Sequence, residues 1–541
     1  MKDRPGRGTE PEATGSGEPV RADLDGVYVG LDLGTSGLKA IALRASGDVV
    51  AKASIGYPTS RPSQGAAEQE PGDWIMAIER AAALLASDAP PGRWRAIGLS
   101  AMIPTLVTAG AGGEPVGPAI TWEDGRAQAQ ADRLCTEFAG LAGRPGSEAI
   151  YEITGQRIDA RYLLPMFLRL IGEDPVRAQE TTIVLGAKDY LFGWLTGDVA
   201  TDPSTATGFG CLTLQASEWN EGILAAAASV KASQSGPGRR RGQMPVLPPV
   251  LPATTTRPLR PGLAVRFGCD RIPVCLGAAD SVLGALGLGA RSPGQIAYVA
   301  GTSTVILGVA GEPLLDPQRR FLVTPLAEPG LWGLEMDLLA TGSALRWLAE
   351  LLGGGIDEAA VIELAAQVNP ADAPVVLPYL SPGEQGALWD PDVPGTIIGL
   401  TLAHDRRYLA RGLVNGIIME SRRCLAVLNE TAAFGTDLLV AGGSAQAASF
   451  RADLANATGR RLIMPAADEA DFSALGAAAL AAQSVGQRPA LLNTADDGSP
   501  VPGQVSEPDC SQAQMWSELW SAHERASLLL RSAGEDRERG R

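Results

Sequence analysis

Two short apolar runs separated by a glycine-rich turn form the clearest pattern in the chain. Residues 27–33 are apolar apart from Gly30 and Asp32, and a second apolar run begins at residue 38 after Gly34 and Gly37. Runs of this length, rich in β-branched and aromatic residues and bounded by glycine, predict β-strands. A turn at residues 45–48 and a further run at 49–55 extend the prediction to a three-stranded antiparallel meander.

The turn after the first strand carries candidate chemistry. Gly34 has no side chain, so a ligand can approach the backbone there, and the amides around Gly34, Thr35 and Ser36 can turn towards an anion. Asp32, at the strand end, suits a metal-bound polyphosphate. The alternative is an ordinary β-turn, in which Asp and Gly serve turn geometry alone.

A second copy of the pattern favours the functional interpretation. Residues 296–309 again predict strand, turn and strand, with Gly301, Thr302 and Ser303 at the turn and Ala300 before it. The second copy therefore lacks the carboxylate. Two similar units far apart indicate a duplicated architecture with a nucleotide between the halves and chemistry on one side only.

Two further strand ends carry candidate site residues. Asp280 stands where an apolar strand beginning at residue 272 runs into a small-residue helix. This carboxylate is either a helix N-cap or a general base placed beside a hydroxyl. The strand at 437–441 ends in Gly442, Gly443 and Ser444, which suits a nucleoside lying on bare backbone, or is a compact strand–helix turn.

Trp122, Asp124 and Arg126 form a cluster that can hold a polyol. The apolar ring of Trp122 can cover the carbon face of a sugar while the charged groups bind its hydroxyls. The alternative, slightly favoured by spacing alone, is a helix start with Asp124 as the cap and Arg126 solvated.

Composition excludes several classes of function. The net charge of −16 over 541 residues argues against a nucleic-acid or anionic-membrane surface, and no apolar run reaches membrane-spanning length. Six scattered cysteines without a Cys-x-x-Cys pair indicate reduced thiols and a cytoplasmic protein. With only two histidines, a His-based triad or multi-His zinc site is not expected.

The chain length predicts two or more domains. Residues 1–25 are expected to be a disordered leader, 26–290 a first domain with a flexible basic insertion near 230–245, and 291–487 a second domain. Residues 488–541 are expected to form a linker and one amphipathic helix around 515–530.

With these motifs in order, the chain resembles the FGGY family of carbohydrate kinases over roughly residues 27–486. The motifs that carry the resemblance are 30–36, Glu70 and Pro71 with Trp74, 122–126, 188–197, Thr201 and Asp202, 277–289, 301–303, 378–381 with 389–391, 395–400, and 442–444. The resemblance implies an α/β fold of two ribonuclease-H-like, actin-like ATPase domains with a central cleft. It also implies ATP and Mg²⁺, with the sugar mainly on the first domain and the nucleotide mainly on the second.

The resemblance also implies roles for individual residues. Asp280 matches the catalytic base, and Asp32 matches the acidic residue near the metal and the phosphates. The phosphate-loop positions match Thr35, Gly301, Thr302 and Ser303, and the adenosine side matches Gly442, Gly443 and Ser444.

Within the family the chain is most similar to xylulokinases, which phosphorylate D-xylulose, but it departs from them in the sugar region. Met102 is followed by Ile103 where those kinases usually carry a histidine, Met166 and Arg169 stand where a Lys and a Trp are usual, and Asn415 replaces a Glu. These changes leave the phosphate chemistry intact and keep gluconate, or another polyol or ketose, open as the substrate. A non-catalytic sugar- or nucleotide-binding regulator on this scaffold is the alternative outside catalysis, disfavoured because both carboxylates are present. The expected partner is a small-molecule sugar, and a homodimer stays open.

Overall fold

The first domain is built on a six-stranded sheet with the strand order β11-β12-β5-β1-β2-β3. The computed structural model describes residues 25–234, 244–381, 386–390, 393–465, 471–489 and 503–539. The predicted antiparallel meander is confirmed, and β5 and β12 add to it in parallel. The strands are β1 (Val27–Leu33), β2 (Gly37–Arg44), β3 (Val49–Gly56), β5 (Trp94–Ala101), β11 (Thr256–Pro258) and β12 (Pro273–Ala279).

The register of this sheet brings the candidate carboxylates together. Leu33 pairs with Ala101, and Ala101 pairs in turn with Ala279. Because carboxyl ends of parallel strands meet at one edge of a sheet, Asp32 and Asp280 lie at the same edge.

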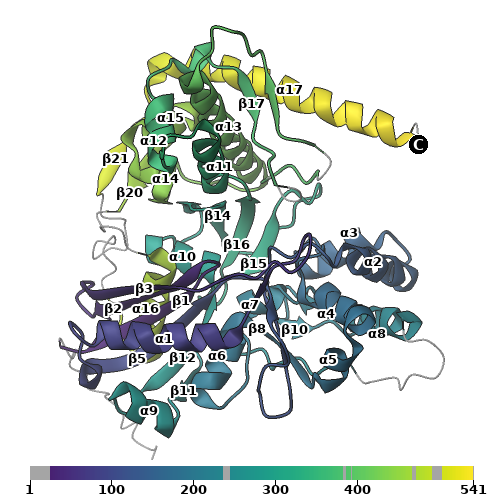
Figure 1. The fold of residues 1–541 in the computed structure, drawn as a ribbon, viewed down its shortest axis with the longest axis vertical. Coiled ribbons are helices and arrows are strands. Elements are labelled where there is room, and N and C mark those ends of the chain that lie inside the picture. The colour runs from purple at the N-terminus through teal and green to yellow at the C-terminus, as the bar shows by residue number, and fades with distance from the viewer. Residues whose placement is uncertain are drawn as a thin grey trace, which may run out of the picture.

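A helical lobe extends the first domain beside a four-stranded sheet with the order β4-β7-β6-β8 (Figure 1). Residues 127–229 are mostly helical. The other elements of the first domain are β4 (Glu68–Gln69), α1 (Pro71–Leu85), β6 (Leu106–Ala109), β7 (Ala119–Ile120), α2 (Gln128–Ala142), α3 (Gly146–Thr154), α4 (Leu163–Glu173), α5 (Pro175–Glu180), β8 (Ile183–Gly186), α6 (Ala187–Thr196), α7 (Pro203–Thr207), β9 (Leu212–Thr213), β10 (Glu218–Trp219), α8 (Glu221–Gln234) and α9 (Pro261–Phe267).

The second domain contains a seven-stranded sheet with the order β15-β16-β14-β13-β19-β20-β21. The predicted second strand pair is confirmed as β13 and β14, and β19 lies parallel to β13 with Ala300 opposite Gly442. The elements are β13 (Ile296–Ala300), β14 (Thr304–Ala310), β15 (Leu322–Pro325), β16 (Trp332–Leu338), α11 (Gly342–Leu352), α12 (Glu358–Ala365), β17 (Val375–Leu377), β18 (Thr396–Ile398), α13 (Arg406–Thr431), β19 (Asp437–Gly442), α14 (Gly443–Gln446), α15 (Ala448–Thr458), β20 (Arg461–Met464), β21 (Gln504–Ser506) and α17 (Ala513–Arg539).

Two helices, α10 (Asp280–Leu288) and α16 (Phe472–Ser484), join the domains. Although α16 lies between β20 and β21 of the second sheet in sequence, it packs on the first sheet, against β1 and β5, and against α10 (Figure 1). The packing is close because glycines face it: a Cβ at Gly30 would lie 1.9 Å from the Ala474 carbonyl oxygen, and one at Gly98 2.0 Å from that of Ala477. Glycine is therefore required at both strand positions.

The predicted leader and insertion lie largely outside the described residues. The leader, residues 1–24, lies outside the described residues, as does 235–243; the part of the expected loop at 230–234 is wrong because α8 continues through it. The predicted C-terminal helix is confirmed as α17.

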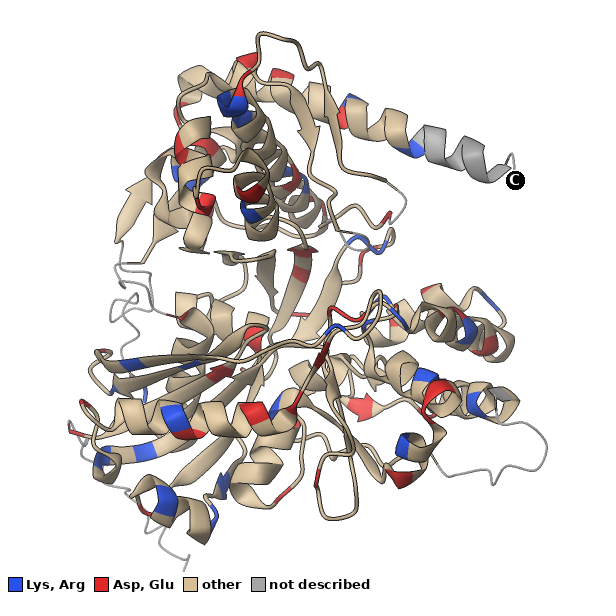
Figure 2. Ribbon diagram, in the orientation of Figure 1, with Lys and Arg blue, Asp and Glu red and all other residues tan. Residues whose placement is uncertain are grey.

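Lys and Arg are interspersed with Asp and Glu over both domains (Figure 2). Within the described ranges, no helix combines the length and apolarity needed to span a bilayer.

Candidate active site

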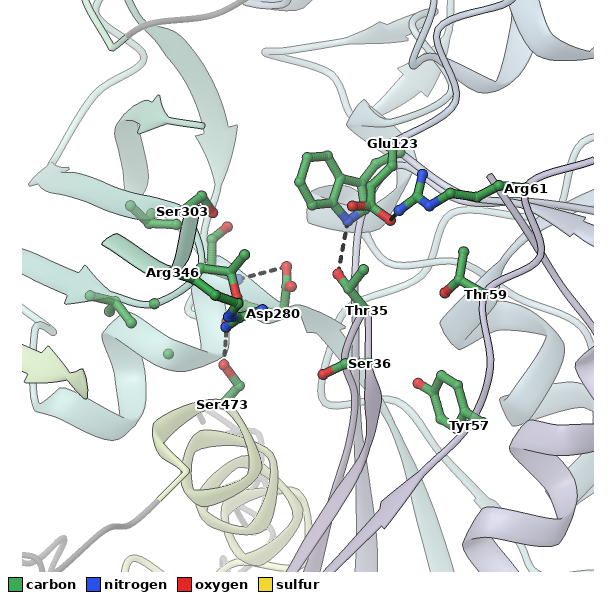
Figure 3. A pocket seen from close by; sticks show the side chains of 17 residues that line it. Thr35, Ser36, Tyr57, Thr59, Arg61, Glu123, Asp280, Ser303, Arg346 and Ser473 are labelled. Atoms are coloured by element: carbon green, nitrogen blue, oxygen red, sulfur yellow. Dashed lines mark hydrogen bonds and ion pairs between the residues drawn. The ribbon is translucent and has the colours of Figure 1, made fainter. Parts of the chain in front are cut away.

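Two adjoining cavities lie where the domains meet. The larger has a volume of about 510 Å³ and the smaller about 160 Å³. Figure 3 shows Thr35 and Ser36 on one side of the larger cavity, Ser303 and Arg346 on the other, and Asp280 between them. The residues common to both cavities are Thr35, Trp122, Asp280, Ser281, Ser303 and Val305.

Asp280 stands at the border of the two cavities, in the first turn of α10. Its Oδ1 accepts a hydrogen bond of 2.9 Å from the Ser281 backbone N–H. Burial, followed by the nearby carboxylate of Glu335, raises the pKa of Asp280 to about 7, while the Ser281 hydrogen bond opposes that rise. A carboxylate with a pKa near neutrality can accept a proton and return it to solvent.

A buried polar network holds the strand that ends at Asp280. The Ala279 N–H donates to Ser204 Oγ at 2.9 Å, and Ser204 Oγ donates to Asp202 at 2.5 Å. Lys188, 1% exposed, lies 3.2 Å from the other oxygen of Asp202. Because every member is buried, the network restricts where α10 can begin.

Asp32 lies under the turn of the first strand pair and is 5% exposed. Ser100 Oγ donates to its Oδ1 at 2.5 Å. Burial raises the pKa of Asp32 well above its ordinary value, and the carboxylates of Asp471 and Asp280 raise it further. The ammonium of Lys39, which pairs with Asp471, lowers the pKa of Asp32 only partly. The concentration of carboxylates at this sheet edge favours a cation.

The first turn is held in place from both sides. Trp122 Nε1–H donates to Thr35 Oγ1 at 3.0 Å, and the Tyr57 hydroxyl donates to the Gly34 carbonyl. Thr35 and Ser36 both line the larger cavity, whereas Gly34 does not. The turn therefore presents two hydroxyl-bearing residues to the space between the domains.

The second turn faces the first across the larger cavity. Gly301, Thr302 and Ser303 all line it, and the first turn of α11 packs on them, with the Ser343 N–H donating to the Thr302 carbonyl at 3.0 Å. Arg346, one turn further along α11, also lines the cavity and pairs with Glu358 at 2.6 Å.

The third candidate loop adjoins the second turn without lining either cavity. Gly442 pairs with Ala300 and has φ of 97°, and a Cβ there would meet the Ala300 carbonyl oxygen at 2.2 Å. Only glycine suits that position. Gly443 and Ser444 follow at the start of α14, so the structure brings the loop to the same sheet edge as the second turn.

Of the three residues in the Trp122 cluster, only the tryptophan lines the cavities. Trp122 lines both cavities, but Asp124 and Arg126 line neither. Asp124 is 1% exposed and accepts from the Ala67 N–H and from Arg126, and Arg126 also pairs with Glu68 at 2.5 Å. The two charges are thus engaged with each other and with β4, away from the sugar position expected for them.

Of the two candidate sugar-binding residues Met102 and Ile103, only one reaches a cavity. Ile103 lines the smaller cavity, whereas Met102 is 3% exposed and its N–H donates to the Leu33 carbonyl. Met102 therefore belongs to the sheet beneath the cavity.

Several polar residues of the smaller cavity were not predicted from the sequence. They are Gln156, Arg161, Tyr162, Glu335 and Asp337. The first three lie between α3 and α4 and the last two on β16, so the tertiary fold alone assembles them. A weak signal existed in β16, where two acidic residues interrupt an otherwise apolar strand.

This arrangement defines a class of protein: a two-domain α/β kinase fold of the actin-like ATPase type, with a carboxylate between the domains. Residues 27–287 match the N-terminal domain, and residues 296–485 the C-terminal domain, of the FGGY family of carbohydrate kinases. The chain therefore belongs to this family and is a carbohydrate kinase, which implies ATP as the phosphoryl donor and a small-molecule sugar as the acceptor.

Relatives of the chain are named after different substrates. The gluconokinase of Bacillus licheniformis is 28% identical over 473 residues, covering 85% of this chain and 88% of its own. The xylulose kinase of Escherichia coli (strain K12) is 30% identical over 456 residues, covering 84% and 89%. The crystal structure of a xylulose kinase from Rhodospirillum rubrum is 28% identical, with a TM-score of 0.78 and coverage of 94% of this chain and 99% of that one.

Proposed function

We propose that the protein transfers the γ-phosphoryl group of ATP to a hydroxyl of a short sugar, with D-xylulose as the first candidate and D-xylulose 5-phosphate as the product. The observation that carries the proposal is Asp280, the carboxylate of near-neutral pKa shared by the two cavities. A sugar in the smaller cavity and a triphosphate in the larger one would both reach it.

In this mechanism Asp280 accepts the proton of the attacking hydroxyl while the sugar oxygen bonds to the γ-phosphorus and the bond to ADP breaks. Thr35 and Ser36 on one wall, and Thr302 and Ser303 on the other, hold and orient the phosphates. Little covalent chemistry is left for the protein, so positioning dominates. Closure of the two domains around the substrates excludes water as a competing acceptor.

The residues present fit Mg²⁺. Its protein sites usually use one or two carboxylates together with substrate phosphates. Asp32 is a buried carboxylate whose pKa is raised by burial and by its carboxylate neighbours, and a cation would relieve that repulsion. Within the described ranges no group of three or more His, Cys, Asp or Glu side chains is placed to hold a metal ion, which agrees with a site completed by phosphates. We propose that Asp32 holds the ion, which would neutralise charge on the transferring phosphoryl group.

The charge of the smaller cavity supports a neutral ketose over an aldonate. Its wall carries Asp280, Glu335 and Asp337, and its guanidinium, Arg161, is paired with Asp159 at 2.7 Å. A substrate carboxylate would meet three acidic groups and one already neutralised cation. Gluconate stays the second candidate because relatives named gluconokinase match as much of the chain as those named xylulose kinase.

An ADP-release assay coupled to NADH oxidation, run over D-xylulose, D-ribulose, D-gluconate, glycerol and a tetritol, tests the proposal. The expected result is the highest kcat/KM with D-xylulose. Use of gluconate alone would replace the first candidate by the second, and ADP release independent of every acceptor would contradict the proposed function.

A further inference from the structure

Arg161 belongs to the wall of the smaller cavity, and its guanidinium is fixed from its own loop. Its Nε lies 2.9 Å from Asp159 Oδ2 and its Nη2 lies 2.7 Å from the same oxygen, while its backbone N–H donates to Asp159 Oδ1 at 2.9 Å. This forked pair sets the plane of the guanidinium. It leaves open how the loop itself is held against the cavity.

The second domain supplies a ring to that loop. The Cζ atom of Arg157 lies 4.5 Å from the centroid of the Trp389 ring, and that of Arg161 lies 6.0 Å from it. Both distances are within the range of a cation–π attraction, which is strongest for tryptophan. One aromatic ring of the second domain therefore faces two guanidinium groups of the first.

The ring is held by its own domain. Trp389 Nε1–H donates to the Arg320 carbonyl at 3.1 Å, and Arg157 Nη1 donates to the Arg319 carbonyl at 3.0 Å. Arg320 in turn pairs with Asp316 at 2.9 Å. The segment 316–320 thus anchors both members of the cation–π stack, the Trp389 ring and Arg157. The ring and this closer guanidinium therefore have a defined relative position.

Neighbouring contacts show that this loop and the last turns of α3 meet the second domain. Gln156 Nε2 donates to the Val323 carbonyl at 2.9 Å, the Val323 N–H donates to the Gly155 carbonyl at 3.0 Å, and the Tyr151 hydroxyl donates to the Phe321 carbonyl at 2.9 Å. Gln156 also lines the smaller cavity. The loop between α3 and α4 is therefore at once a cavity wall and a contact between domains.

We infer that Trp389, which lines neither cavity, is a positioning residue for the sugar site: through Arg157 and Arg161 it holds the cavity wall from the opposite domain. The inference rests on the proposed function, because it takes the smaller cavity as the sugar site. It predicts that the stack affects the sugar and not the nucleotide, since Trp389, Arg157 and Arg161 do not line the larger cavity.

The test measures kcat and the KM values for D-xylulose and ATP in Trp389→Ala, Trp389→Phe and Arg157→Ala. Loss of the ring is expected to raise the KM for the sugar about tenfold, within the range of a desolvated cation–π contact. The KM for ATP should stay within about twofold. Phe keeps an aromatic face and should restore most of the loss.

Arg144→Ala is the matched control, because this arginine of the same lobe forms an exposed ion pair with Glu152 at 2.7 Å. It should leave all parameters unchanged. Equal increases in both KM values, or a lower melting temperature with unchanged kinetics, would show that Trp389 is merely structural and would overturn the inference. A wild type inactive on every sugar would instead contradict the proposed function, and this inference with it.

Discussion

Asp280→Asn removes the carboxylate shared by the two cavities while keeping its size and a hydrogen-bonding group. An amide can still accept the Ser281 N–H but cannot take a proton from a sugar hydroxyl. Loss of a general base typically lowers the rate by about 10²–10⁴, so we expect kcat to fall by that factor. Nucleotide binding should be nearly unchanged, because it depends on the turns on either side of the larger cavity.

The pH profile follows from the pKa of about 7 at Asp280. At about pH 6 only roughly a tenth of wild-type molecules would carry the ionised base, and at about pH 8 roughly nine-tenths would. The wild-type kcat/KM should therefore rise about tenfold over this range. The residual activity of the asparagine variant should not show this rise with pH.

The free energy of unfolding should change with pH in the direction opposite to that of kcat/KM. Because the folded-state pKa of about 7 exceeds the ordinary value of 3.8, the folded protein binds more protons than the unfolded chain between these values. Its free energy of unfolding therefore falls as pH rises through that window. The shift sets a ceiling of about 4 kcal/mol, and partial exposure of the side chain to the cavity reduces our expectation to about 1–2 kcal/mol.

Initial rates of ADP release, ATP binding by calorimetry and thermal melts, all measured from about pH 4 to pH 9, check the expected changes in rate, nucleotide affinity and stability. The variant should melt higher than wild type above neutral pH and equally near pH 4. Turnover within a few-fold of wild type would refute the assignment of Asp280 as the base and leave it a helix-start residue.

Three further variants test other parts of the structure. Asp32→Ala should lower ATP-dependent kcat/KM by about 10²-fold without lowering the melting temperature, because a buried carboxylate among like charges is itself unfavourable; a large loss of thermal stability without ligand would contradict this. Ile103→His should raise the ratio of kcat/KM for D-xylulose over that for the other sugars; an unchanged ratio would show that this position does not contact the sugar. Gly30→Ala should lower the free energy of unfolding in urea by about 3 kcal/mol, since its Cβ would meet the Ala474 carbonyl oxygen, whereas Gly72→Ala, where a Cβ meets nothing within 4 Å, should not.

The strand-and-turn units were predictable because their signals are local. Alternating apolar residues and glycines define β1, β2, β13 and β14, and the register of parallel strands then brings the residues at their ends to one edge. Asp280 was predictable for the same reason, as the residue between a strand and a helix. Its raised pKa was not, since this depends on burial and on Glu335 from the other domain.

The sugar cavity could not be predicted from local patterns. Arg161 and Asp337 come from segments far apart in the chain, and their polarity alone does not distinguish them from solvated residues. The Trp122 cluster shows the converse: three neighbouring residues suited to a polyol, of which only the ring reaches a cavity. Asp124 and Arg126 pair with each other instead, and the capping alternative is wrong too, because α2 begins at Gln128 without a side-chain cap and Arg126 is not solvated.

The position of α16 has a consequence for how the chain folds during synthesis. Residues 472–484 cover the face of the first sheet at β1 and β5, where glycines leave room for the backbone of a helix. A ribosome releases the amino-terminal half first, so that face stays uncovered until most of the chain has emerged. The strands of the first domain can pair early, but their packing is completed only by a segment made near the end, and a fragment ending before residue 472 would expose a groove that no other described element fills.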